Sequence, residues 1–373
     1  MNIATSPTSS IAAGRLADRL ADGECITVLD LREDAEWGIE APGVISRRMP
    51  PASVLADPVA AARKLAGPVA VVCNRGVAAQ PVAQALRGLG VDAVVVEDGM
   101  RGWILALQSR AVDLGVEGLV VRQVQRPARG CLSYLLAADG RALVIDPAPD
   151  AAFYVLLAEE LGVRITDIFD THLHADHISG ARTLSEQTGA ALRLPALALE
   201  RGVVYADQVA PVRDGDEITL GTVTLRAISL PGHTTDMTGL LIADRALIGG
   251  DSLFLDGMAR PDLQQSDPAG ALAMGRILHD TLRERVLALG DDVILLPGHT
   301  RPGVRADAVV SALADVRVAV AELAVDDPGE FAARLLSDMP PRPANYEAII
   351  AVNAGHRPFD PELETGGNSC SAR

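Results

Sequence analysis

The chain has 373 residues, enough for two domains, of which 49% are hydrophobic and only 3% aromatic. Its formal net charge of −16 excludes a nucleic-acid partner, because a protein that binds a phosphate backbone needs a basic face. No apolar run approaches the roughly 20 residues of a membrane span, and residues 1–10 show no signal-peptide pattern, so we expect no membrane partner. Four widely spaced cysteines predict reduced thiols and a cytoplasmic location: Cys25, Cys73, Cys131 and Cys370.

Strand and helix patterns alternate over the first hundred residues. Short apolar runs predict strands, and apolar residues at helical spacing predict helices. This alternation indicates a parallel α/β sheet. In chain order we expect a helix at 11–20, a strand at 25–31, a helix at 60–65, a strand at 69–72, a helix at 79–89 and a strand at 91–96.

Cys73 is the first candidate catalytic residue. It follows the predicted strand 69–72 and precedes a predicted helix N-terminus, where loop amides and the helix dipole stabilise a thiolate. Arg75 adds positive charge. The alternative, which position alone leaves open, is that Cys73 is a small buried hydrophobic residue.

Residues 1–110 resemble a rhodanese domain at three places. Asp30-Leu31-Arg32-Glu33 with Glu36-Trp37 resembles the first rhodanese signature, and Cys73-x-x-Gly76 resembles the active-site loop. The run from Glu97 to Trp103 resembles the closing signature. The resemblance implies that Cys73 accepts a sulfane sulfur as a persulfide. The loop around it would consist of Asn74, Arg75, Gly76, Val77 and Ala78.

Ala78 departs from the rhodanese pattern, which often has an arginine at this loop position. A rhodanese domain that binds persulfide or docks a partner without catalysing transfer is therefore a further hypothesis.

A β-rich pattern begins after the short linker 108–116. Asp139-Gly140 is a hairpin-turn signal between two of the predicted strands. We expect a structural role for Cys131, which begins the second strand. The predicted strands cover 119–125, 132–137 and 141–145, and a helix covers 151–161.

A dense cluster of metal-binding residue types follows, on a loop between a predicted strand at 165–169 and a predicted helix at 178–189. Alternation can turn His172 and His174 toward one point, and Asp176 with His177 toward a neighbouring point. Imidazole and carboxylate groups are the usual ligands of zinc, iron and manganese. The pattern H-x-H-x-D-H is much more specific than a lone histidine, so we expect a metal site.

Three further ligand candidates, His233, Asp251 and His299, each follow a short apolar strand pattern. Strand ends that meet at one edge of a sheet are where α/β-type folds place their sites. His279 lies in a helical pattern instead, and we expect it at the surface or partly buried. The three strand patterns cover 225–230, 246–250 and 293–296.

Residues 116–373, including a C-terminal extension at 336–373, resemble the metallo-β-lactamase superfamily. The order H-x-H-x-D-H, Gly-His, Gly-Asp, Gly-His is its signature, and it is complete here. The resemblance implies a four-layer αβ/βα sandwich with the metal at one edge. The expected fold class is thus α/β plus α+β, with a rhodanese-like parallel α/β domain before the sandwich.

Two chemistries compete within this superfamily. In a hydrolase of the glyoxalase II type, two zinc ions per chain lower the pKa of a bridging water, which attacks a thioester. One zinc would be held by His172, His174 and His233, the other by Asp176, His177 and His299, with Asp251 bridging.

In a persulfide dioxygenase, a single Fe(II) is bound by His172, His233 and Asp251 only. Two histidines and one carboxylate leave three open positions, at which a persulfide sulfur and O2 can bind side by side. The remaining residues would then orient the ligands or hold a second metal: His174, Asp176, His177 and His299.

The segment after Asp251 resembles the persulfide dioxygenases in a region that the hydrolases do not share. It includes Arg260 and Asp262, and the stretch 340–346 with Asn353 resembles a C-terminal segment of the same family. Arg260 is a candidate for contacting a substrate carboxylate or orienting the site; a salt bridge with Asp262 is the alternative. Asp262 and Tyr346 are further candidates for substrate contact.

The presence of a rhodanese domain favours the dioxygenase, because both domains would handle the same sulfur. We therefore expect oxidation of a low-molecular-weight persulfide, such as glutathione persulfide, by O2 to sulfite. Sulfane-sulfur transfer through Cys73 would involve thiosulfate or sulfite. The resemblance to this family also leads us to expect a homodimer.

Overall fold

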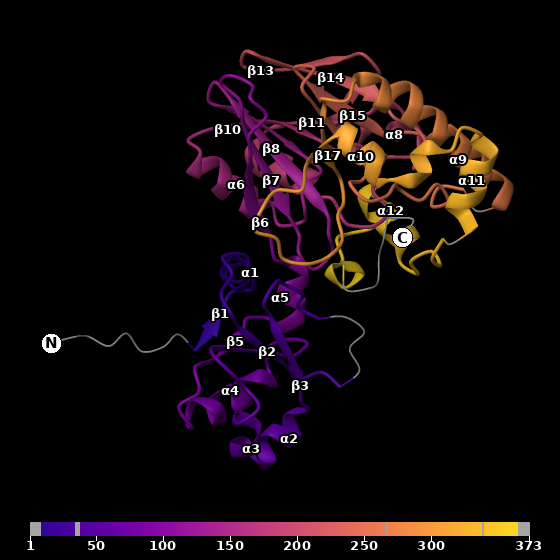
Figure 1. The fold of residues 1–373 in the computed structure, drawn as a ribbon. Coiled ribbons are helices and arrows are strands. Elements are labelled where there is room, and N and C mark those ends of the chain that lie inside the picture. The colour runs from indigo at the N-terminus through magenta and orange to yellow at the C-terminus, as the bar shows by residue number, and fades with distance from the viewer. Residues whose placement is uncertain (1–8, 34–37, 266, 338, 365–373) are drawn as a thin grey trace. The chain divides into compact units, whose positions relative to one another are not determined.

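The structure is a computed structural model that describes residues 9–33, 38–265, 267–337 and 339–364. The chain divides into two compact units, drawn as a ribbon in Figure 1. Glu36-Trp37 of the first rhodanese-like signature lies outside the described residues, as do Cys370 and the rest of 365–373. Unit 1 comprises Met1–Gln108, Gln125–Gly130 and Arg301–Asp307, and unit 2 comprises Ser109–Val124, Cys131–Thr300 and Ala308–Arg373.

Two short segments that the sequence places in the second domain are grouped with unit 1. Within that unit the Arg126 guanidinium donates a hydrogen bond to the Ile104 carbonyl, at 2.7 Å. Val304 is buried in a core cluster of unit 1, and its amide donates to the Glu40 carbonyl at 2.9 Å. The expected domain bounds 1–110 and 116–373 stay a prediction.

Unit 1 contains the parallel α/β sheet that the alternation of strands and helices predicts. All four strand pairs are parallel. In sheet order the strands are β1 (Ser10–Ile11), β5 (Ala93–Val96), β4 (Val69–Val72), β2 (Thr27–Asp30) and β3 (Ile45–Arg48). The helices are α1 (Ala13–Ala21), α2 (Pro51–Ala56), α3 (Pro58–Ala62), α4 (Ala79–Arg87) and α5 (Gly99–Leu105).

Both faces of this sheet are buried, because successive residues of a strand point to opposite faces. In β4, Ala70 and Val72 belong to the core cluster that includes residues of α1 and α5. Val69 and Val71 belong to the cluster that includes residues of α2, α3 and α4. The two clusters hold the carboxyl end of β4, and therefore Cys73, in a fixed place.

Unit 2 has two sheets packed face to face. The first has the order β12-β11-β10-β9-β8-β7-β6 and the second the order β13-β14-β15-β16-β17-β18. The first sheet's strands are β6 (Gln108–Val112), β7 (Val120–Gln125), β8 (Leu132–Ala138), β9 (Arg141–Ile145), β10 (Arg164–Phe169), β11 (Ala191–Pro195) and β12 (Ala210–Val212). The second sheet's are β13 (Glu217–Leu220), β14 (Val223–Ser229), β15 (Thr238–Ile242), β16 (Ala246–Gly250), β17 (Ile294–Pro297) and β18 (Ser311–Ala312).

Helices cover the outer faces of both sheets. One core cluster joins residues of β8 to β10 with residues of β14 to β17, and so lies between the sheets. A second cluster joins the other face of β14 to β17 with α9, α10 and α11, while α6 and α7 pack against β10. The helices are α6 (Ala151–Glu160), α7 (Ala181–Thr188), α8 (Ala196–Glu200), α9 (Pro268–Thr281), α10 (Leu313–Ala319), α11 (Pro328–Ser337) and α12 (Tyr346–Asn353), with short helical turns η1 (Ala206–Gln208), η2 (Leu282–Val286), η3 (Leu287–Leu289), η4 (Ala321–Ala324) and η5 (Pro361–Glu364).

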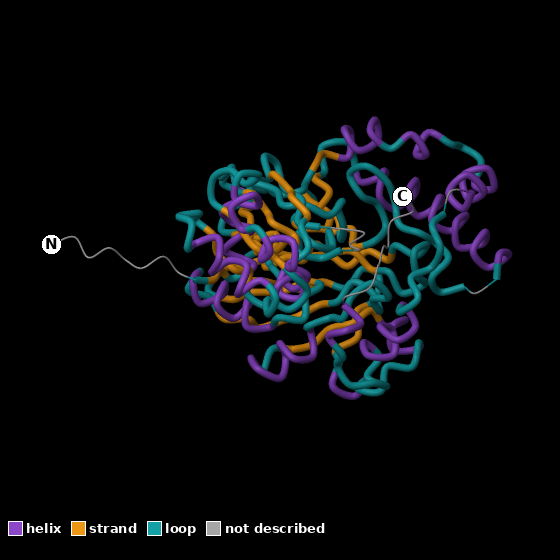
Figure 2. The backbone as a smooth tube through the Cα atoms, turned by 90° about the horizontal axis from the view of Figure 1, so that it is seen from below, coloured by secondary structure: helices purple, strands orange, loops and turns teal. Residues whose placement is uncertain are grey.

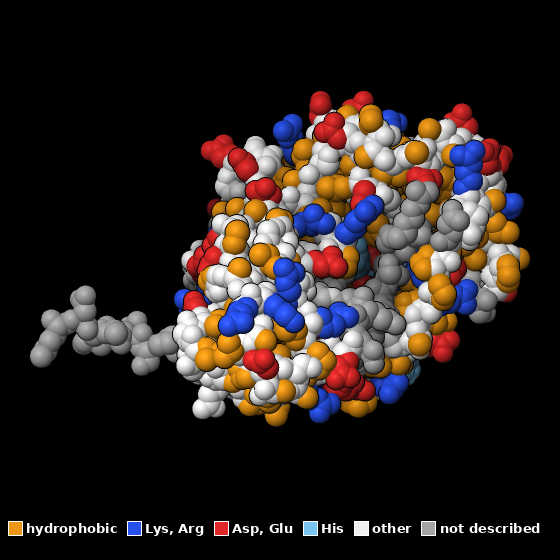
Figure 3. Space-filling model, turned by 60° about the horizontal axis from the view of Figure 1, so that its bottom comes forward, with side chains coloured by type: hydrophobic (Ala, Val, Ile, Leu, Met, Phe, Trp, Pro, Cys, Tyr) orange, Lys and Arg blue, Asp and Glu red, His pale blue; other side chains and the backbone are white. Residues whose placement is uncertain are grey.

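The helix–sheet–sheet–helix layers confirm the expected four-layer αβ/βα sandwich. Figure 2 shows the strands and helices of the same chain from a second direction. On the face drawn in Figure 3, basic side chains are mixed with acidic and apolar ones. Among the described residues, no helix is both long and apolar enough to cross a bilayer.

Candidate functional site

The seven predicted metal-binding residues of unit 2 come together, and all of them are buried. The loop after β10 supplies four of them, and the segments after β14, β16 and β17 supply one each. They form three neighbouring groups, two of which include residues that the sequence did not predict as metal ligands. The seven are His172, His174, Asp176, His177, His233, Asp251 and His299.

The first group consists of His172, His233 and Asp251, whose ligand atoms lie within 4.8 Å of one another. Nε2 of each histidine and Oδ2 of Asp251 are buried and have no hydrogen-bond partner. An unsatisfied buried polar atom costs about 1–3 kcal/mol, so three of them at one point are unfavourable without a ligand. Two imidazole nitrogens and one carboxylate oxygen fit a divalent transition metal.

Hydrogen bonds at the opposite ring nitrogens fix the orientation of both histidines. Nδ1 of His233 donates to the Arg260 carbonyl at 2.7 Å. Nδ1 of His172 lies 3.0 Å from Oγ1 of Thr171, which itself donates to Oδ2 of Asp146 at 2.9 Å. Both rings therefore carry their proton on Nδ1, and the bare Nε2 atoms face the metal position. Burial lowers the pKa of His172, which keeps the ring neutral as a ligand must be.

His299 lies between two buried carboxylates. Its Nδ1 is 2.8 Å from Oδ1 of Asp251, and its Nε2 is 2.6 Å from Oδ2 of Asp176. Burial alone would lower the pKa of His299, but the two carboxylates outweigh it and raise the pKa well above the ordinary value. Burial likewise would raise the pKa of Asp251, but His299 holds it below the usual range. Oδ1 of Asp251 is thus engaged by His299, and only Oδ2 is free.

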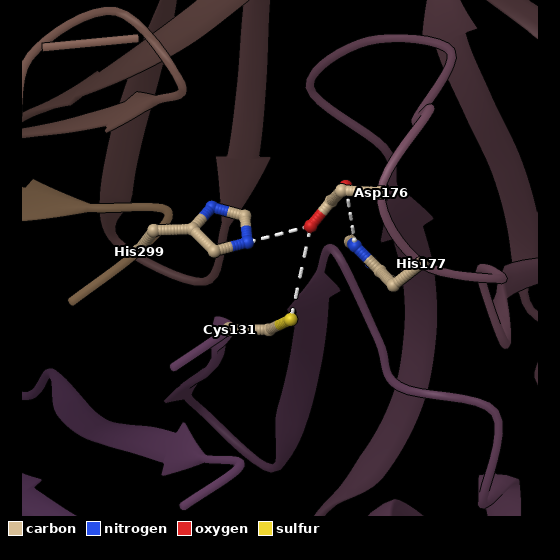
Figure 4. Close-up of side chains that lie close together, drawn as sticks. All are labelled: Cys131, Asp176, His177 and His299. Carbon is tan, nitrogen blue, oxygen red and sulfur yellow. Dashed lines mark hydrogen bonds and ion pairs between the residues drawn. The ribbon is translucent and has the colours of Figure 1, made fainter. Parts of the chain in front are cut away.

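The second group consists of Cys131, Asp176, His177 and His299 (Figure 4). The Cys131 thiol lies 3.8 Å from Oδ2 of Asp176, and Nδ1 of His177 donates to Oδ1 of Asp176 at 3.0 Å. The sequence predicted a structural role for Cys131. Its thiol is one of four groups here that could hold a metal ion, and its backbone forms an isolated β-bridge with His299. The structural role of Cys131 stays a prediction.

The third group contains His174 with two acidic residues, Asp146 and Asp170. Nε2 of His174 donates to Oδ1 of Asp146 at 3.1 Å, and its Nδ1 has no partner. Burial lowers the pKa of His174, but the nearby carboxylates leave it above its ordinary value. The Nδ1 of His174 is thus a buried nitrogen that a metal could use. Asp146 was not predicted; its only sequence signal is its place at the end of a strand, before Pro147.

Three side chains far away in the sequence hold the backbone of the metal-binding loop. Nδ2 of Asn353 donates to the carbonyls of His174 and His177, both at 2.9 Å, and its Oδ1 accepts from the Ser179 amide at 2.9 Å. Asp236 accepts from the Leu173 amide at 2.8 Å, and Glu364 accepts from the Ile178 amide at 2.5 Å. The sequence noted Asn353 only as part of a resembling segment.

Arg260 is buried and forms a two-point salt bridge with Asp262, with N–O distances of 2.7 and 3.0 Å. Burial would raise the pKa of Asp262, but Arg260 lowers it below the ordinary value. The same guanidinium donates to the carbonyls of Pro340 and Pro341, at 2.8 and 3.3 Å. Arg260 thus forms the salt bridge with Asp262 that the sequence analysis gave as the alternative to substrate contact. Its guanidinium also links the C-terminal segment to the loop whose carbonyl orients His233.

Tyr346, the other substrate candidate, packs in a small apolar cluster with Ala175 of the metal-binding loop and Leu263. Its hydroxyl lies 3.1 Å from a carboxylate oxygen of Glu347. Contacts of Arg260, Asp262 and Tyr346 with substrate stay predictions.

In unit 1, Cys73 is buried at the carboxyl end of β4, and its loop is closely packed. The Met100 amide donates to the Cys73 carbonyl at 2.8 Å. Gly99 has a φ of 56°, and a Cβ there would lie 2.0 Å from that carbonyl oxygen, so only glycine fits. Four residues of the predicted loop are exposed around the cysteine, while Gly76 is buried: Asn74, Arg75, Val77 and Ala78.

Two family models match separate parts of the chain. The model of the metallo-beta-lactamase superfamily matches residues 126–299, and that of the rhodanese-like domain matches residues 12–106.

Two kinds of curated relative match about half of the chain. A human protein, "Persulfide dioxygenase ETHE1, mitochondrial", is 28% identical over 190 residues, which is 50% of this chain and 70% of the relative. A "Hydroxyacylglutathione hydrolase" of Methylobacterium sp. (strain 4-46) is 33% identical over 163 residues, 43% of this chain and 58% of the relative. The match thus covers little more than half of the hydrolase.

Among solved structures, ETHE1 from Myxococcus xanthus has a TM-score of 0.55 and 28% identity, over 64% of this chain and 99% of that one. A metallo-beta-lactamase from Staphylococcus aureus subsp. aureus COL has a TM-score of 0.60 and 23% identity, over 65% and 75%. At this identity, the similarity to the Staphylococcus aureus structure shows only that the two chains share a fold.

Asn353→Ala should loosen the metal-binding loop, because it leaves two carbonyls and one amide without their partner. We expect metal affinity to fall about tenfold to a hundredfold, as for other residues that support ligands. Metal competition against a chromophoric chelator measures this. Asn345→Ala, which removes a bond to the Leu363 carbonyl and none to the loop, is the matched control. Equal affinities for the two variants would contradict the anchoring role.

Arg260→Gln should lower the free energy of unfolding by about 3 kcal/mol, because it leaves the buried Asp262 carboxylate without its main partner. Denaturant unfolding measures the change. Arg342→Gln, which removes a 3.3 Å contact to the same carboxylate, should cost less. If Arg260→Gln instead raised KM for the substrate with unchanged stability, direct substrate contact would be the correct role.

Proposed function

We propose that this chain, a rhodanese-like domain followed by a metallo-beta-lactamase domain, oxidises a low-molecular-weight persulfide with O2. The balanced reaction is RSSH + O2 + H2O → RSH + SO3²⁻ + 2 H⁺, in which one sulfur loses four electrons and O2 accepts them. One Fe(II) per chain would be held by His172, His233 and Asp251. The observation that carries the proposal is that these three residues converge with unpaired ligand atoms while His299 and Asp176 bind each other.

The arrangement of Asp251 favours one metal over two. In a dinuclear hydrolase the Asp251 carboxylate would contact both metals, whereas here its Oδ1 is paired with Nδ1 of His299 at 2.8 Å. Both nitrogens of His299 face carboxylates, so this ring, as an imidazolium, can supply the positive charge that a second metal would bring. Three protein ligands leave three positions for the persulfide sulfur and O2.

Bound Fe(II) would supply the redox chemistry between O2 and the persulfide sulfur. The chain's own groups hold the geometry. Thr171 and the Arg260 carbonyl fix the two imidazole rings, and His299 fixes the Asp251 carboxylate. The candidate ligands are themselves buried, which limits the access of bulk water to the metal position.

The dinuclear zinc hydrolase of glyoxalase II type is the second candidate. The free Nδ1 of His174 favours it, because that nitrogen could complete a zinc site with His172 and His233. The similarity to hydroxyacylglutathione hydrolases points in the same direction.

Cys73 would carry the sulfane sulfur in the rhodanese-like domain, either from thiosulfate to the carrier thiol or onto sulfite. The alternative of a non-catalytic docking domain rests on Ala78, where rhodaneses often have arginine. The carrier thiol, a homodimer and a cytoplasmic location stay predictions.

Anaerobically prepared Fe(II)-loaded protein should consume O2 with glutathione persulfide and release one sulfite per O2, whereas zinc-loaded protein should not. An oxygen electrode with sulfite determination measures this. His233→Ala should lose both the iron and the activity, while His356→Gln, outside all three groups, should keep both. Thioester hydrolysis by the zinc form, without O2 uptake by the iron form, would instead establish the hydrolase.

Cys73→Ser should abolish transfer of sulfur from thiosulfate and leave O2 uptake with free persulfide unchanged, because the two reactions use different domains. A sulfurtransferase assay with cyanide or sulfite, beside the oxygen electrode, separates them. Cys25→Ser, at an exposed cysteine of the same unit, is the matched control. Wild-type protein without sulfurtransferase activity would support the docking alternative.

A further inference from the structure

The second group of candidate ligands includes a thiol that neither of the candidate reactions uses. Its four residues are buried, and each offers one ligand atom within 4.8 Å of the others. They come from three separate segments, namely the residue before β8, the metal-binding loop and the loop after β17 (Figure 4). A thiol, a carboxylate and two imidazoles are together ligand types of zinc. The four residues are Cys131, Asp176, His177 and His299.

The spacing of these groups fits a tetrahedral cation. At zinc–ligand distances of about 2.0–2.3 Å, neighbouring ligand atoms of a tetrahedron lie about 3.3–3.6 Å apart. Sγ of Cys131 lies 3.8 Å from Oδ2 of Asp176, close to this range. Nε2 of His299 lies 2.6 Å from the same oxygen, so this contact would open when a cation replaced the proton between the two atoms.

The charges of the group also fit a divalent cation. Asp176 and a Cys131 thiolate together carry two negative charges at a buried place, and one dication neutralises both. On binding, the dication replaces two protons, one from the Cys131 thiol and one from Nε2 of His299. The net charge of the buried group therefore does not change, and no uncompensated charge is left in the interior.

A cation bound here leaves the first group as it is. Nε2 of His299 would bind the cation, while Nδ1 of the same ring keeps its contact with Oδ1 of Asp251 at 2.8 Å. Asp251 is then not shared between two metals, whereas in the dinuclear hydrolase it would bridge them. The fourth ligand, which the hydrolase takes from Asp251, is here the thiolate of Cys131.

We propose that Cys131, Asp176, His177 and His299 form a separate tetrahedral site for a thiophilic divalent cation such as zinc. Thiolate ligands favour zinc over magnesium, calcium and manganese, whereas the two imidazoles and one carboxylate of the first group accept iron. The two neighbouring groups thus bind different metals. Cys131 and His299 are the most exposed of the four residues, at 8% each, so the cation enters from their side.

Titration of the full chain with cobalt(II) under anaerobic conditions, followed by absorption spectroscopy, tests the site without O2 or persulfide. A cobalt–thiolate bond gives a charge-transfer band in the near ultraviolet, which imidazole and carboxylate ligands alone do not give. We expect this band in the wild-type protein and also in His233→Ala, whose first group lacks a ligand. Zinc should displace the cobalt and abolish the band, because a tetrahedral site with a thiolate suits zinc.

Cys131→Ser should abolish the band and lower the affinity for zinc by at least about a hundredfold, the upper end of the loss caused by removing a residue that only supports ligands. Substitution to serine at each of the other three cysteines, Cys25, Cys73 and Cys370, should keep the band and is the matched control. His177→Gln, which keeps the thiol, should weaken cobalt binding and retain the band at saturation. The Tm of each metal-free variant shows that it is folded.

Two bound cobalt ions without a thiolate band would overturn the proposal, since the second metal would then be held as in the dinuclear hydrolase. Binding of a single cobalt ion, at the first group only, would overturn it as well. So would a band that Cys131→Ser retains, or a cobalt affinity that His177→Gln leaves unchanged. The test is independent of the proposed oxidation, because the cobalt spectrum needs no turnover and O2 uptake by the iron form needs no second metal.

Discussion

The candidate metal centre depends on two contacts of the His299 imidazole, one with the Asp251 carboxylate and one with the Asp176 carboxylate. Two buried carboxylates this close would repel each other in a medium of low polarity, and a positively charged ring between them removes that cost. It also decides which oxygen of Asp251 remains free. A single ring thereby links the ends of β16 and β17 to the loop after β10.

The fold provides the rigidity that this interaction needs. The core between the two sheets of unit 2 is continuous from β8 to β17, so the strand ends that carry the candidate ligands cannot shift independently. The irregular metal-binding loop lies outside this core and has no ladder of its own. Its position therefore depends on side chains such as Asn353, Asp236 and Glu364, which bind its backbone.

The alternation of strands and helices predicted the parallel sheet, and short apolar strands that each end in a motif residue predicted the convergence of the histidines. The sandwich was predicted from the resemblance to the metallo-β-lactamase superfamily, since the apolar pattern indicates only a mixed α/β fold. The sequence analysis missed β3, whose four residues Ile45–Arg48 are all exposed and give no apolar pattern. It also missed Asp146, Cys131 and Asn353 as neighbours of the site, since a contact across 28 to 179 residues leaves no local signal. The role of Arg260 stayed ambiguous for the same reason. Its salt-bridge partner Asp262 is two residues away in the sequence, but its other partner, the Pro340 carbonyl, is 80 residues away.

The C-terminal segment makes the geometry of the metal centre depend on the last part of the described chain. Through Arg260 it reaches the carbonyl that orients His233, and through Asn353 it holds the carbonyls of His174 and His177. Each hydrogen bond contributes only about 1 kcal/mol, but together they fix ring positions on which ligand geometry depends. His174 is held by the same anchor, and its buried Nδ1 has no hydrogen-bond partner. Residues outside the candidate ligand set, such as Arg260 and Asn353, therefore help to determine the geometry of the metal centre.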